Sequence, residues 1–267
     1  MKNSMRNLIV CVLFSMTASF FACQPKVHDT RLMTYNVRNC RGMDDLLSFE
    51  HVAEIVKKEN PDVVAIQELD SMTKRSNGVY VLGELARLTG MHDTYSPAID
   101  FDGGKYGVGM LSKEKPLQVY HRALPGREEL RTLLIAEFND YVCCCTHLSL
   151  TEEDRFASIA IITEELGRFK KPVFIAGDWN DEPNSEFIQQ MQKNFNLIST
   201  VNQFTFPADT PNMTIDYIAV SQFVPVSFKK RDSYVIEAPV ESDHRPVMRS
   251  EERRVGKECR SRWSPYH

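Results

Sequence analysis

Short apolar runs alternate with amphipathic stretches along most of the chain. Runs rich in β-branched and other apolar residues, bounded by polar or turn-forming residues, predict strands. Apolar residues at helical spacing, as at Leu46, Phe49, Val52, Ile55 and Val56, predict helices. We expect strands at 31–36, 63–68, 107–112, 117–123, 131–138, 141–148, 172–176, 215–220, 224–229 and 245–248. We expect helices at 46–59, 79–88, 151–166 and 185–194.

Turn and capping residues set the limits of several of these elements. Asn60-Pro61 closes the first helix, and Gly90 closes the second. Thr151 precedes three acidic residues, which is typical of a helix start. Asn139-Asp140 lies between two strands and predicts a hairpin. The roughly ten strands and four helices predict an α/β domain with at least two sheets. We place this domain at residues 31–248.

The first residues have the pattern of an export signal. Lys2 and Arg6 precede an uncharged, mostly apolar run at 8–21, and Ala22-Cys23 follows. We interpret residues 1–22 as a signal peptide. The end of this segment resembles a bacterial lipoprotein signal, which implies lipidation of Cys23 and a short linker at 23–30. A signal cleaved without lipidation and an uncleaved anchor are the alternatives.

The last residues, 249–267, combine dense mixed charge with no apolar period. Their basic residues could be taken for a nucleic-acid-binding tail. The string instead looks like the in-frame translation of a sequencing adapter. We therefore expect an artefactual, disordered tail and set it aside before interpreting the fold. On this interpretation the natural C-terminus is missing and the last strand ends at Val247 or Met248.

Setting both ends aside changes the charge of the chain. The whole sequence of 267 residues has a formal net charge of −4, whereas residues 23–248 contain 24 basic and 33 acidic residues. A body with a net charge of −9 does not attract polyanions over its whole surface, although a local patch or a metal ion can still bind one. The consecutive Cys143, Cys144 and Cys145 do not suit a disulfide framework, so we expect buried free thiols. Cys144 should face the opposite side of its strand from the other two.

Several apolar strands stop at polar residues that suit catalysis. These residues are Asn36, Glu68, His147, Asp178, Asn180, Asp216, Asp243 and His244. Strand ends favour functional groups because the sheet fixes them and the following loop exposes them. Carboxylates and carboxamides suit Mg²⁺ or Mn²⁺. An oxygen-ligated metal with two histidines is suited to the attack of water on a phosphate ester.

These residues lie in strings that, in this order, resemble the endonuclease/exonuclease/phosphatase superfamily. The strings are Tyr35-Asn36-Val37, Gln67-Glu68, Gly107 with Leu111-Ser112, Thr146-His147-Leu148, Gly177-Asp178-Trp179-Asn180, Ile215-Asp216-Tyr217 and Ser242-Asp243-His244. The resemblance covers nearly the whole body. It implies a deoxyribonuclease-I-like fold, a four-layer α/β sandwich in which two mixed β-sheets pack face to face with helices outside.

The resemblance also implies roles for individual residues. Glu68 would bind Mg²⁺ or Mn²⁺, together with Asn36 and Asp243. Asp178 and Asn180 would orient the water and a phosphate oxygen. His244, held by Asp216, would be the general base.

His147 would be the general acid or a hydrogen-bond donor to phosphate. The carboxylate that orients this second histidine in the family has no evident counterpart in the sequence. Arg75 and Arg131 are candidates for phosphate contacts. Tyr106 is one position away from a phosphate-binding tyrosine of the family, and we leave it out of the site.

The family has several substrate classes, so three hypotheses remain open. The first is a metal-dependent phosphodiesterase or phosphatase of small or lipid phosphoesters. The second is an exported DNA or RNA endonuclease, and the third is a catalytically silent surface binding lipoprotein. We expect a monomer that is periplasmic or anchored to the outer membrane of a bacterium, and that meets the membrane only through Cys23.

Overall fold

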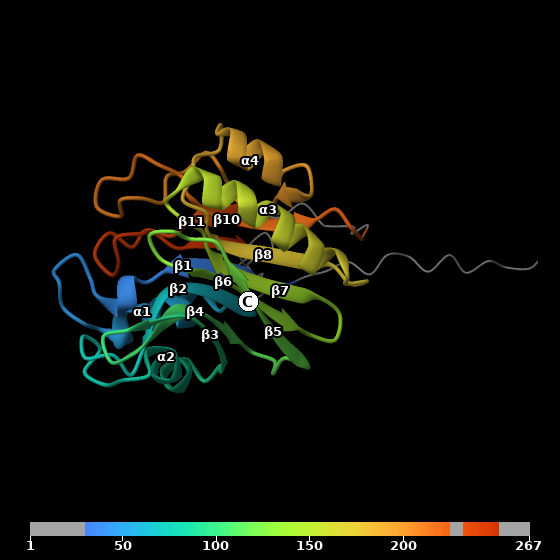
Figure 1. Ribbon diagram of the computed structural model, residues 1–267. Coiled ribbons are helices and arrows are strands. Elements are labelled where there is room, and N and C mark those ends of the chain that lie inside the picture. Colours follow the sequence, from blue (N-terminus) through green and yellow to red (C-terminus); the bar gives the residue numbers. More distant parts are fainter. Residues whose placement is uncertain (1–29, 225–231, 251–267) are drawn as a thin grey trace, which may run out of the picture.

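Two six-stranded sheets form the centre of the protein, seen in a computed structural model that describes residues 30–224 and 232–250 (Figure 1). The first sheet has the order β11-β12-β1-β2-β4-β3, and the second has the order β5-β6-β7-β8-β10-β9. The strands of the first sheet are β1 (Leu32–Asn36), β2 (Val63–Ser71), β3 (His92–Phe101), β4 (Gly104–Ser112), β11 (Asp232–Val235) and β12 (Val247–Ser250). Those of the second are β5 (Gln118–Leu124), β6 (Arg131–Glu137), β7 (Val142–His147), β8 (Val173–Asp178), β9 (Phe195–Leu197) and β10 (Asp216–Ser221).

Helices cover the outer face of each sheet. They are α1 (Phe49–Glu59), α2 (Val81–Thr89), α3 (Glu152–Gly167) and α4 (Glu186–Met191), with a short 3₁₀ helix, η1 (Arg38–Cys40). In Figure 1, α1 and α2 lie below the sheets, and α3 and α4 lie above them. None of the helices in the described part of the chain has the length and apolar character needed to cross a membrane.

Three apolar clusters hold these layers together. One lies between the two sheets and includes Leu32, Val63 and Leu134. The second joins the first sheet to α1 and α2, and the third joins the second sheet to α3 and α4. The expected four-layer α/β sandwich is therefore confirmed. Burial of apolar surface on both faces of each sheet is its main source of stability.

Most predicted elements are present, with ends set by local hydrogen bonds. Helix α1 begins at Phe49, later than the expected residue 46, because the Ser48 side chain caps it by accepting a hydrogen bond from the His51 N–H. It ends at Asn60, which adopts the left-handed conformation before Pro61, as expected. The hairpin at Asn139-Asp140 joins the antiparallel strands β6 and β7.

Sequence patterns missed strand β3 and placed the last strands imprecisely. β3 is an edge strand that pairs only with β4, and its polar, partly exposed sequence lacks an apolar pattern. Pro97 is tolerated there because an edge strand leaves one side unpaired. The short β9 was also missed, since we expected helix to residue 194, whereas α4 ends at Met191. Most of the strand expected at 224–229 lies outside the described residues.

The cysteines of β7 follow the expected alternation. Cys143 and Cys145 lie in the apolar cluster between the sheets, whereas Cys144 lies in the cluster beneath α3 and α4. All three, together with Cys40, are buried free thiols. Burial raises the pKa of the Cys145 thiol to about 12, so the protonated form is favoured there.

The last strand of the first sheet runs past residue 248. Strand β12 continues to Ser250, and Arg249 pairs with Leu32 of β1. The sheet thus extends two residues beyond the expected boundary at 248. The predicted signal peptide, Cys23, nearly all of the linker and residues 251–267 lie outside the described residues.

Candidate active site

The sheet topology brings the predicted polar residues to one edge. β1 and β2 are parallel, as are β7 and β8, so the carboxyl ends of each pair lie together. β10 runs antiparallel to β8, which places its first residue, Asp216, directly opposite Asp178 at the end of β8. His147 at the end of β7 is the partner of Asp178 on the other side. Residues separated by many positions in the chain thus become neighbours through strand register.

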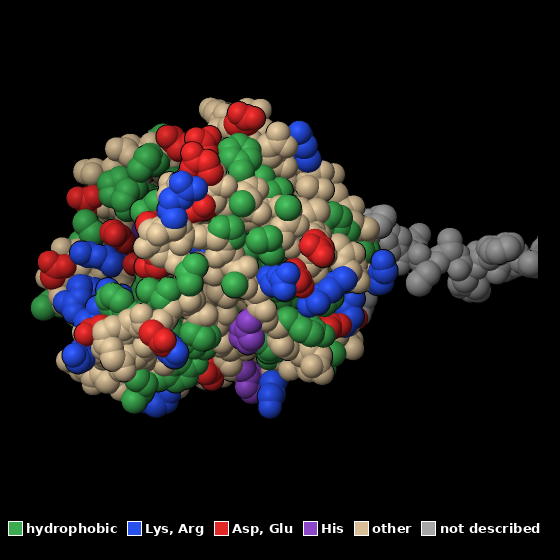
Figure 2. All heavy atoms as spheres, in the orientation of Figure 1, with side chains coloured by type: hydrophobic (Ala, Val, Ile, Leu, Met, Phe, Trp, Pro, Cys, Tyr) green, Lys and Arg blue, Asp and Glu red, His purple; other side chains and the backbone are tan. Residues whose placement is uncertain are grey.

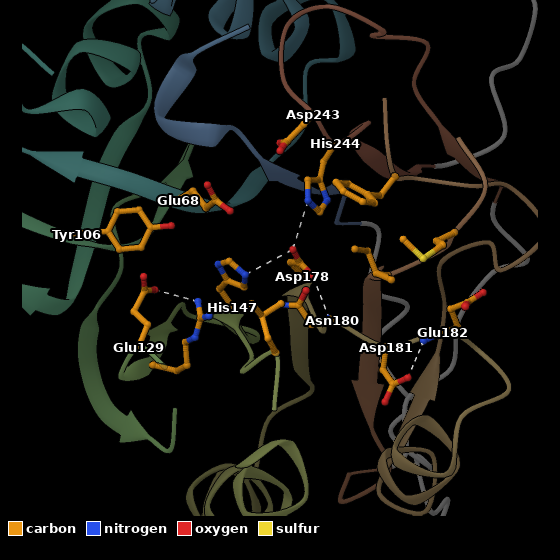
Figure 3. A pocket seen from close by; sticks show the side chains of 15 residues that line it. Glu68, Tyr106, Glu129, His147, Asp178, Asn180, Asp181, Glu182, Asp243 and His244 are labelled. Carbon is orange, nitrogen blue, oxygen red and sulfur yellow. Dashed lines mark hydrogen bonds and ion pairs between the residues drawn. The ribbon is translucent and has the colours of Figure 1, made fainter. Parts of the chain in front are cut away.

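These strand ends open into a pocket of about 570 Å³ (Figure 3). Predicted residues that line it are Glu68, Arg131, His147, Asp178, Asn180, Asp243 and His244. Further lining residues are Tyr106, Glu129, Leu150, Asp181, Glu182, Phe206, Met213 and Ile215. Of the other predicted residues, Asn36 and Asp216 lie behind this surface, where they contact its carboxylates and imidazoles.

Glu68 reaches the pocket because strand β2 is irregular at this position. The pairing of β2 with β4 shifts register between Ile66 and Leu69. Glu68 itself has a φ of 59°, in the left-handed region that an ordinary strand residue avoids. A bulge of this kind redirects a side chain out of the normal alternation. The Glu68 carboxylate accepts a hydrogen bond of 3.0 Å from the Asn36 amide.

Gln67 is a buried polar residue immediately beside this bulge. Its Oε1 accepts a hydrogen bond of 3.3 Å from Thr34 Oγ1, and its Nε2 lies 3.3 Å from Cys145 Sγ. These contacts join β2 to β1 in the same sheet and to β7 in the other. Because the backbone at Gln67 leads directly into Glu68, the contacts fix the position from which the carboxylate projects.

We expect Gln67→Leu to lower the affinity for Mn²⁺ about tenfold, because groups that orient a metal ligand typically contribute this much. Isothermal titration calorimetry measures the affinity, and thermal unfolding checks that the fold is retained. Thr34→Val removes one of the two contacts and should have a smaller effect. An unchanged affinity of Gln67→Leu would show that the bulge positions Glu68 without Gln67.

Asp178 occupies the centre of the site. Its Oδ2 lies 3.6 Å from the Nε2 atoms of both His147 and His244, and it accepts a hydrogen bond of 3.1 Å from the Asn36 amide. Its Oδ1 accepts from the backbone N–H of Asn180 at 2.9 Å. Burial raises the pKa of Asp178 to about 7, with a smaller contribution from the charge of Asp216.

His244 is held between two carboxylates and an aromatic ring. Its Nδ1 lies 2.9 Å from Asp216 Oδ2, and the Phe206 ring packs against the imidazole with centroids 4.7 Å apart. Burial opposes a charge on His244, but the attraction of Asp216 and Asp178 outweighs it and raises the pKa to about 10. Asp216 thus contacts the imidazole that, on the resemblance, it would hold.

His147 has the opposite electrostatic environment. Burial and the nearby Arg131 hold the pKa of His147 well below its usual value, so its neutral form is favoured. A neutral imidazole suits hydrogen bonding to phosphate better than proton donation. Among the contacts of residues 30–224 and 232–250, the carboxylate that meets His147 is Asp178, which it shares with His244.

Gly177 precedes Asp178 in β8 and is paired with Thr146 of β7. A Cβ atom at Gly177 would lie 1.9 Å from the backbone oxygen of Thr146, and the φ of 156° further disfavours a side chain. Only glycine therefore allows Asp178 to follow a strand in this position.

Gly177→Ala should destabilise the protein by about 3 kcal/mol, because the backbone oxygen cannot move without disrupting the sheet. Gly167→Ala is the matched control, since a Cβ atom there meets nothing within 4 Å. The control should stabilise α3 by up to about 1 kcal/mol. Urea denaturation measures both effects, and equal stabilities would contradict the close approach at Gly177.

The two predicted arginines differ in their relation to the pocket. Arg131 lines it and forms ion pairs with Glu128 and Glu129 at 3.4 and 3.0 Å. Arg75 does not line it. Its guanidinium makes two hydrogen bonds to Asp70, at 2.7 and 2.9 Å, and lies over the Tyr106 ring. Arg75 therefore contacts the site indirectly, through a pocket residue.

Tyr106 lines the pocket although the sequence analysis left it out of the site. It immediately precedes the Gly107 to Ser112 motif, one position away from the family tyrosine. Its location opposite Asp70, beyond the bulge of β2, brings it to the pocket wall. Its place in the pocket depends on this pairing with β2, which the sequence of β4 alone does not contain.

Two groups of residues offer ligands for a metal ion. The Glu68 and Asp243 carboxylates line one side of the pocket, with Asn36 behind them, where its Nδ2 donates to Glu68 and its Oδ1 accepts from the Arg38 N–H. Among the described residues no Lys or Arg forms an ion pair with Glu68, whereas Asp243 lies 3.9 Å from the Arg38 guanidinium. A carboxylate in a pocket without a cationic partner is suited to Mg²⁺ or Mn²⁺.

The other group is Asp178, Asp216 and His244, whose ligand atoms lie within 4.8 Å of one another. These three are buried and already bonded to each other, as His244 Nδ1 lies 2.9 Å from Asp216. We interpret these three residues as hydrogen-bonded groups that share a proton, rather than as a metal centre.

Solved structures with this fold come from bacteria and animals. An endonuclease/exonuclease/phosphatase from Bacteroides vulgatus superposes with a TM-score of 0.67 at 19% identity, covering 83% of this chain and 98% of that one. A mannosyl-6-phosphatase from Bacteroides thetaiotaomicron gives 0.62 at 17% identity, with 83% and 98% covered. Truncated TDP2 from Caenorhabditis elegans gives 0.60 at 19% identity, with 83% and 96% covered.

A search of the curated proteins finds no significant match. The sequence model of the Endonuclease/Exonuclease/phosphatase family, in contrast, matches residues 33–244, which include every catalytic and metal-binding residue proposed from the motifs. Members of this family are generally hydrolases that act on phosphoesters. The matched region spans most of the chain, and the chain belongs to the endonuclease/exonuclease/phosphatase family.

Proposed function

We propose that the protein is a Mg²⁺- or Mn²⁺-dependent phosphoesterase that hydrolyses a phosphate ester by in-line attack of water. The observation that carries this proposal is the convergence of Glu68, Asp178, His147 and His244 on one pocket (Figure 3). Water activation, charge neutralisation and phosphate binding each have a suitable group there.

Glu68, Asn36 and Asp243 would hold the metal ion, which when bound neutralises charge on the phosphate. Their oxygen donors fit Mg²⁺ or Mn²⁺ better than softer metals. Asn180, which donates through Nδ2 to the Leu148 carbonyl at 2.8 Å, is fixed beside Asp178 and helps to orient the water.

The water oxygen forms a bond to phosphorus as the ester P–O bond breaks. The Asp178–His244 pair takes the water proton, and the departing alkoxide takes up a proton from solvent. Because these groups interact closely, the proton belongs to the pair rather than to His244 alone. Asp216 holds the imidazole in place, and the neutral His147 and the Arg131 guanidinium donate hydrogen bonds to phosphate oxygens.

An exported endonuclease is the second candidate, supported by the family of the chain. A nuclease usually holds the nucleic-acid backbone with an extended basic surface. Figure 2 instead shows acidic and basic side chains interspersed on the face in view. The single arginine of the pocket is also paired with two glutamates. These observations favour a small phosphoester over a polynucleotide.

Hydrolysis of bis-(p-nitrophenyl) phosphate in the presence of Mg²⁺ tests the activity. We expect EDTA to abolish it and added Mg²⁺ or Mn²⁺ to restore it. Activity that persists in EDTA, or in His244→Ala, would overturn the metal-assisted mechanism. Absence of all hydrolysis would favour the silent binding protein instead. Plasmid nicking by the wild type but not by His147→Ala would favour the endonuclease function over hydrolysis of a small phosphoester.

We further propose that the protein is exported and anchored through a lipid on Cys23, and that it is a monomer. The proposal rests on the sequence pattern of residues 1–23. Mass spectrometry of the N-terminus of the protein, isolated from a bacterial host, should show an acylated Cys23. An unmodified N-terminus would favour a simple cleaved signal. Light scattering measures the mass of the purified domain in solution.

A further inference from the structure

The pocket has two chemically different sides. Tyr106 and Glu129 lie on one side of His147, and Asp181 and Glu182 lie on the other (Figure 3). Arg131 lies with Glu129, to which it is ion-paired at 3.0 Å.

Three apolar residues of the lining belong with the second side. The Ile215 carbonyl accepts from the Trp179 N–H at 2.8 Å, close to Asp181 in the chain, and the Ile215 N–H donates to Thr205 Oγ1, next to Phe206. Phe206 packs against His244 and pairs with Met213. We call Phe206, Met213, Ile215 and Glu182 the alcohol side. This inference rests on the proposed phosphoesterase function and specifies its substrate.

We propose that the alcohol side receives the alcohol portion of the phosphoester, and that this portion is uncharged and has an apolar face. The substrate would therefore carry one phosphate, held at the metal and His147, and no second phosphate. Nucleic-acid strands and polyphosphorylated alcohols do not meet this description.

The apolar part of the alcohol side is a preformed surface. Phe206 and Met213 pair as an antiparallel bridge, with backbone hydrogen bonds of 3.1 and 2.9 Å in the two directions. The hairpin that they close is tied to the catalytic motif, because Ala208 N–H donates to the Asp243 carbonyl at 2.7 Å. A fixed apolar wall binds an apolar group without the entropic cost of ordering a loop.

The charge on the alcohol side is negative. Asp181 is paired with the buried Arg155 at 2.9 Å, whereas Glu182 is exposed and makes no ion pair among the described residues. Among the described residues that line the pocket there is no lysine, and the arginine, Arg131, is paired with Glu129 on the opposite side. A second phosphate placed beside Glu182 would thus meet a like charge without a compensating cation.

The same groups suit an uncharged alcohol. Phe206 and Met213 supply apolar contact, and the Glu182 carboxylate accepts hydrogen bonds from hydroxyl groups. The phosphate itself would bind away from the alcohol side, because its hydrogen-bond donors, His147 and Arg131, are not part of that side. The apolar wall and the Glu182 carboxylate together therefore favour an uncharged alcohol that is esterified to a single phosphate.

Glucose 6-phosphate and glucose 1,6-bisphosphate test the charge selection, since they differ by one phosphate. The wild type should have at least a tenfold higher kcat/KM for the monophosphate, as expected for uncompensated like charges in a pocket. Glu182→Lys should raise the kcat/KM for the bisphosphate about fivefold, by replacing repulsion with attraction at partial solvent exposure. Glu164→Lys makes the same charge change on the exposed surface of α3 and should leave the ratio unchanged.

Inhibition by phosphonates tests the apolar wall. Benzylphosphonate should inhibit at least tenfold more strongly than methylphosphonate, because burial of an aromatic ring typically contributes this much affinity. Met213→Ala should reduce that ratio. Equal inhibition by the two compounds, a preference for the bisphosphate, or an unchanged ratio in Glu182→Lys would overturn the inference. Failure to hydrolyse both bis-(p-nitrophenyl) phosphate and p-nitrophenyl phosphate with Mg²⁺ would instead overturn the proposed function itself.

Discussion

Asp178→Asn should lower kcat by about a thousandfold, which is within the usual contribution of a general base. Asparagine keeps the size of the side chain and can still accept a hydrogen bond from Asn36, but it cannot take a proton from water. Because the Asp178 carboxylate touches both histidines, its loss removes the group that couples them. Steady-state hydrolysis of bis-(p-nitrophenyl) phosphate at saturating Mg²⁺ measures the effect.

Stability should not fall in the same variant. Burial raises the pKa of Asp178 to about 7, so at pH 8 the carboxylate is ionised in the fold and the fold bears the cost of burying that charge. A neutral amide avoids this cost. We expect Asp178→Asn to unfold at pH 8 at the same temperature as the wild type or higher. Asp209→Asn, at an exposed residue of the loop between β9 and β10, is the control and should retain full activity. A thousandfold loss in the control, or less than tenfold in Asp178→Asn, would contradict the assigned role.

Glu68→Gln should weaken Mn²⁺ binding at least a hundredfold and abolish metal-dependent hydrolysis, since a carboxylate ligand of a divalent cation contributes a full negative charge. The amide cannot replace that charge, although it has nearly the same shape. The effect should exceed that of Gln67→Leu, which leaves the carboxylate in place. Isothermal titration calorimetry with Mn²⁺ gives the affinity independently of turnover.

Glu50→Gln is the matched control for this experiment. Glu50 lies on the exposed first turn of α1, so Glu50→Gln makes the same chemical change away from the pocket. The metal affinity and the activity of this variant should equal those of the wild type. Persistence of tight Mn²⁺ binding in Glu68→Gln would redirect the metal to Asp178, Asp216 and His244, the other group with suitable geometry. Loss of binding in Asp216→Asn but not in Glu68→Gln would establish that alternative.

The fold could be predicted from the sequence for elements whose own residues have both the apolar pattern of a buried element and the turn or capping residues that end it. β2 and β8 are buried strands with continuous apolar sequences, and α1 has both a helical apolar period and residues that cap its ends. Such elements are specified by the residues within them. β3 is different, because its edge position and its single partner depend on the rest of the sheet.

The site residues could be predicted as a set, because polar residues at the ends of apolar strands stand out and their order resembles a known family. Their spatial relations could not. That Asp178 lies between two histidines follows from the register of β7, β8 and β10, and that Glu68 faces the pocket follows from a bulge. Register and bulges depend on contacts between distant segments, which no local pattern contains.

The sequence by itself determined the class of fold and the chemical groups available for catalysis, because apolar periodicity and residue type are properties of short segments. Only the tertiary structure decided how those groups act. It placed Arg75 behind Tyr106 rather than in the pocket, and it gave His147 and His244 opposite pKa shifts. Electrostatic environment depends on burial and on neighbouring charges, which exist only once distant strands have paired.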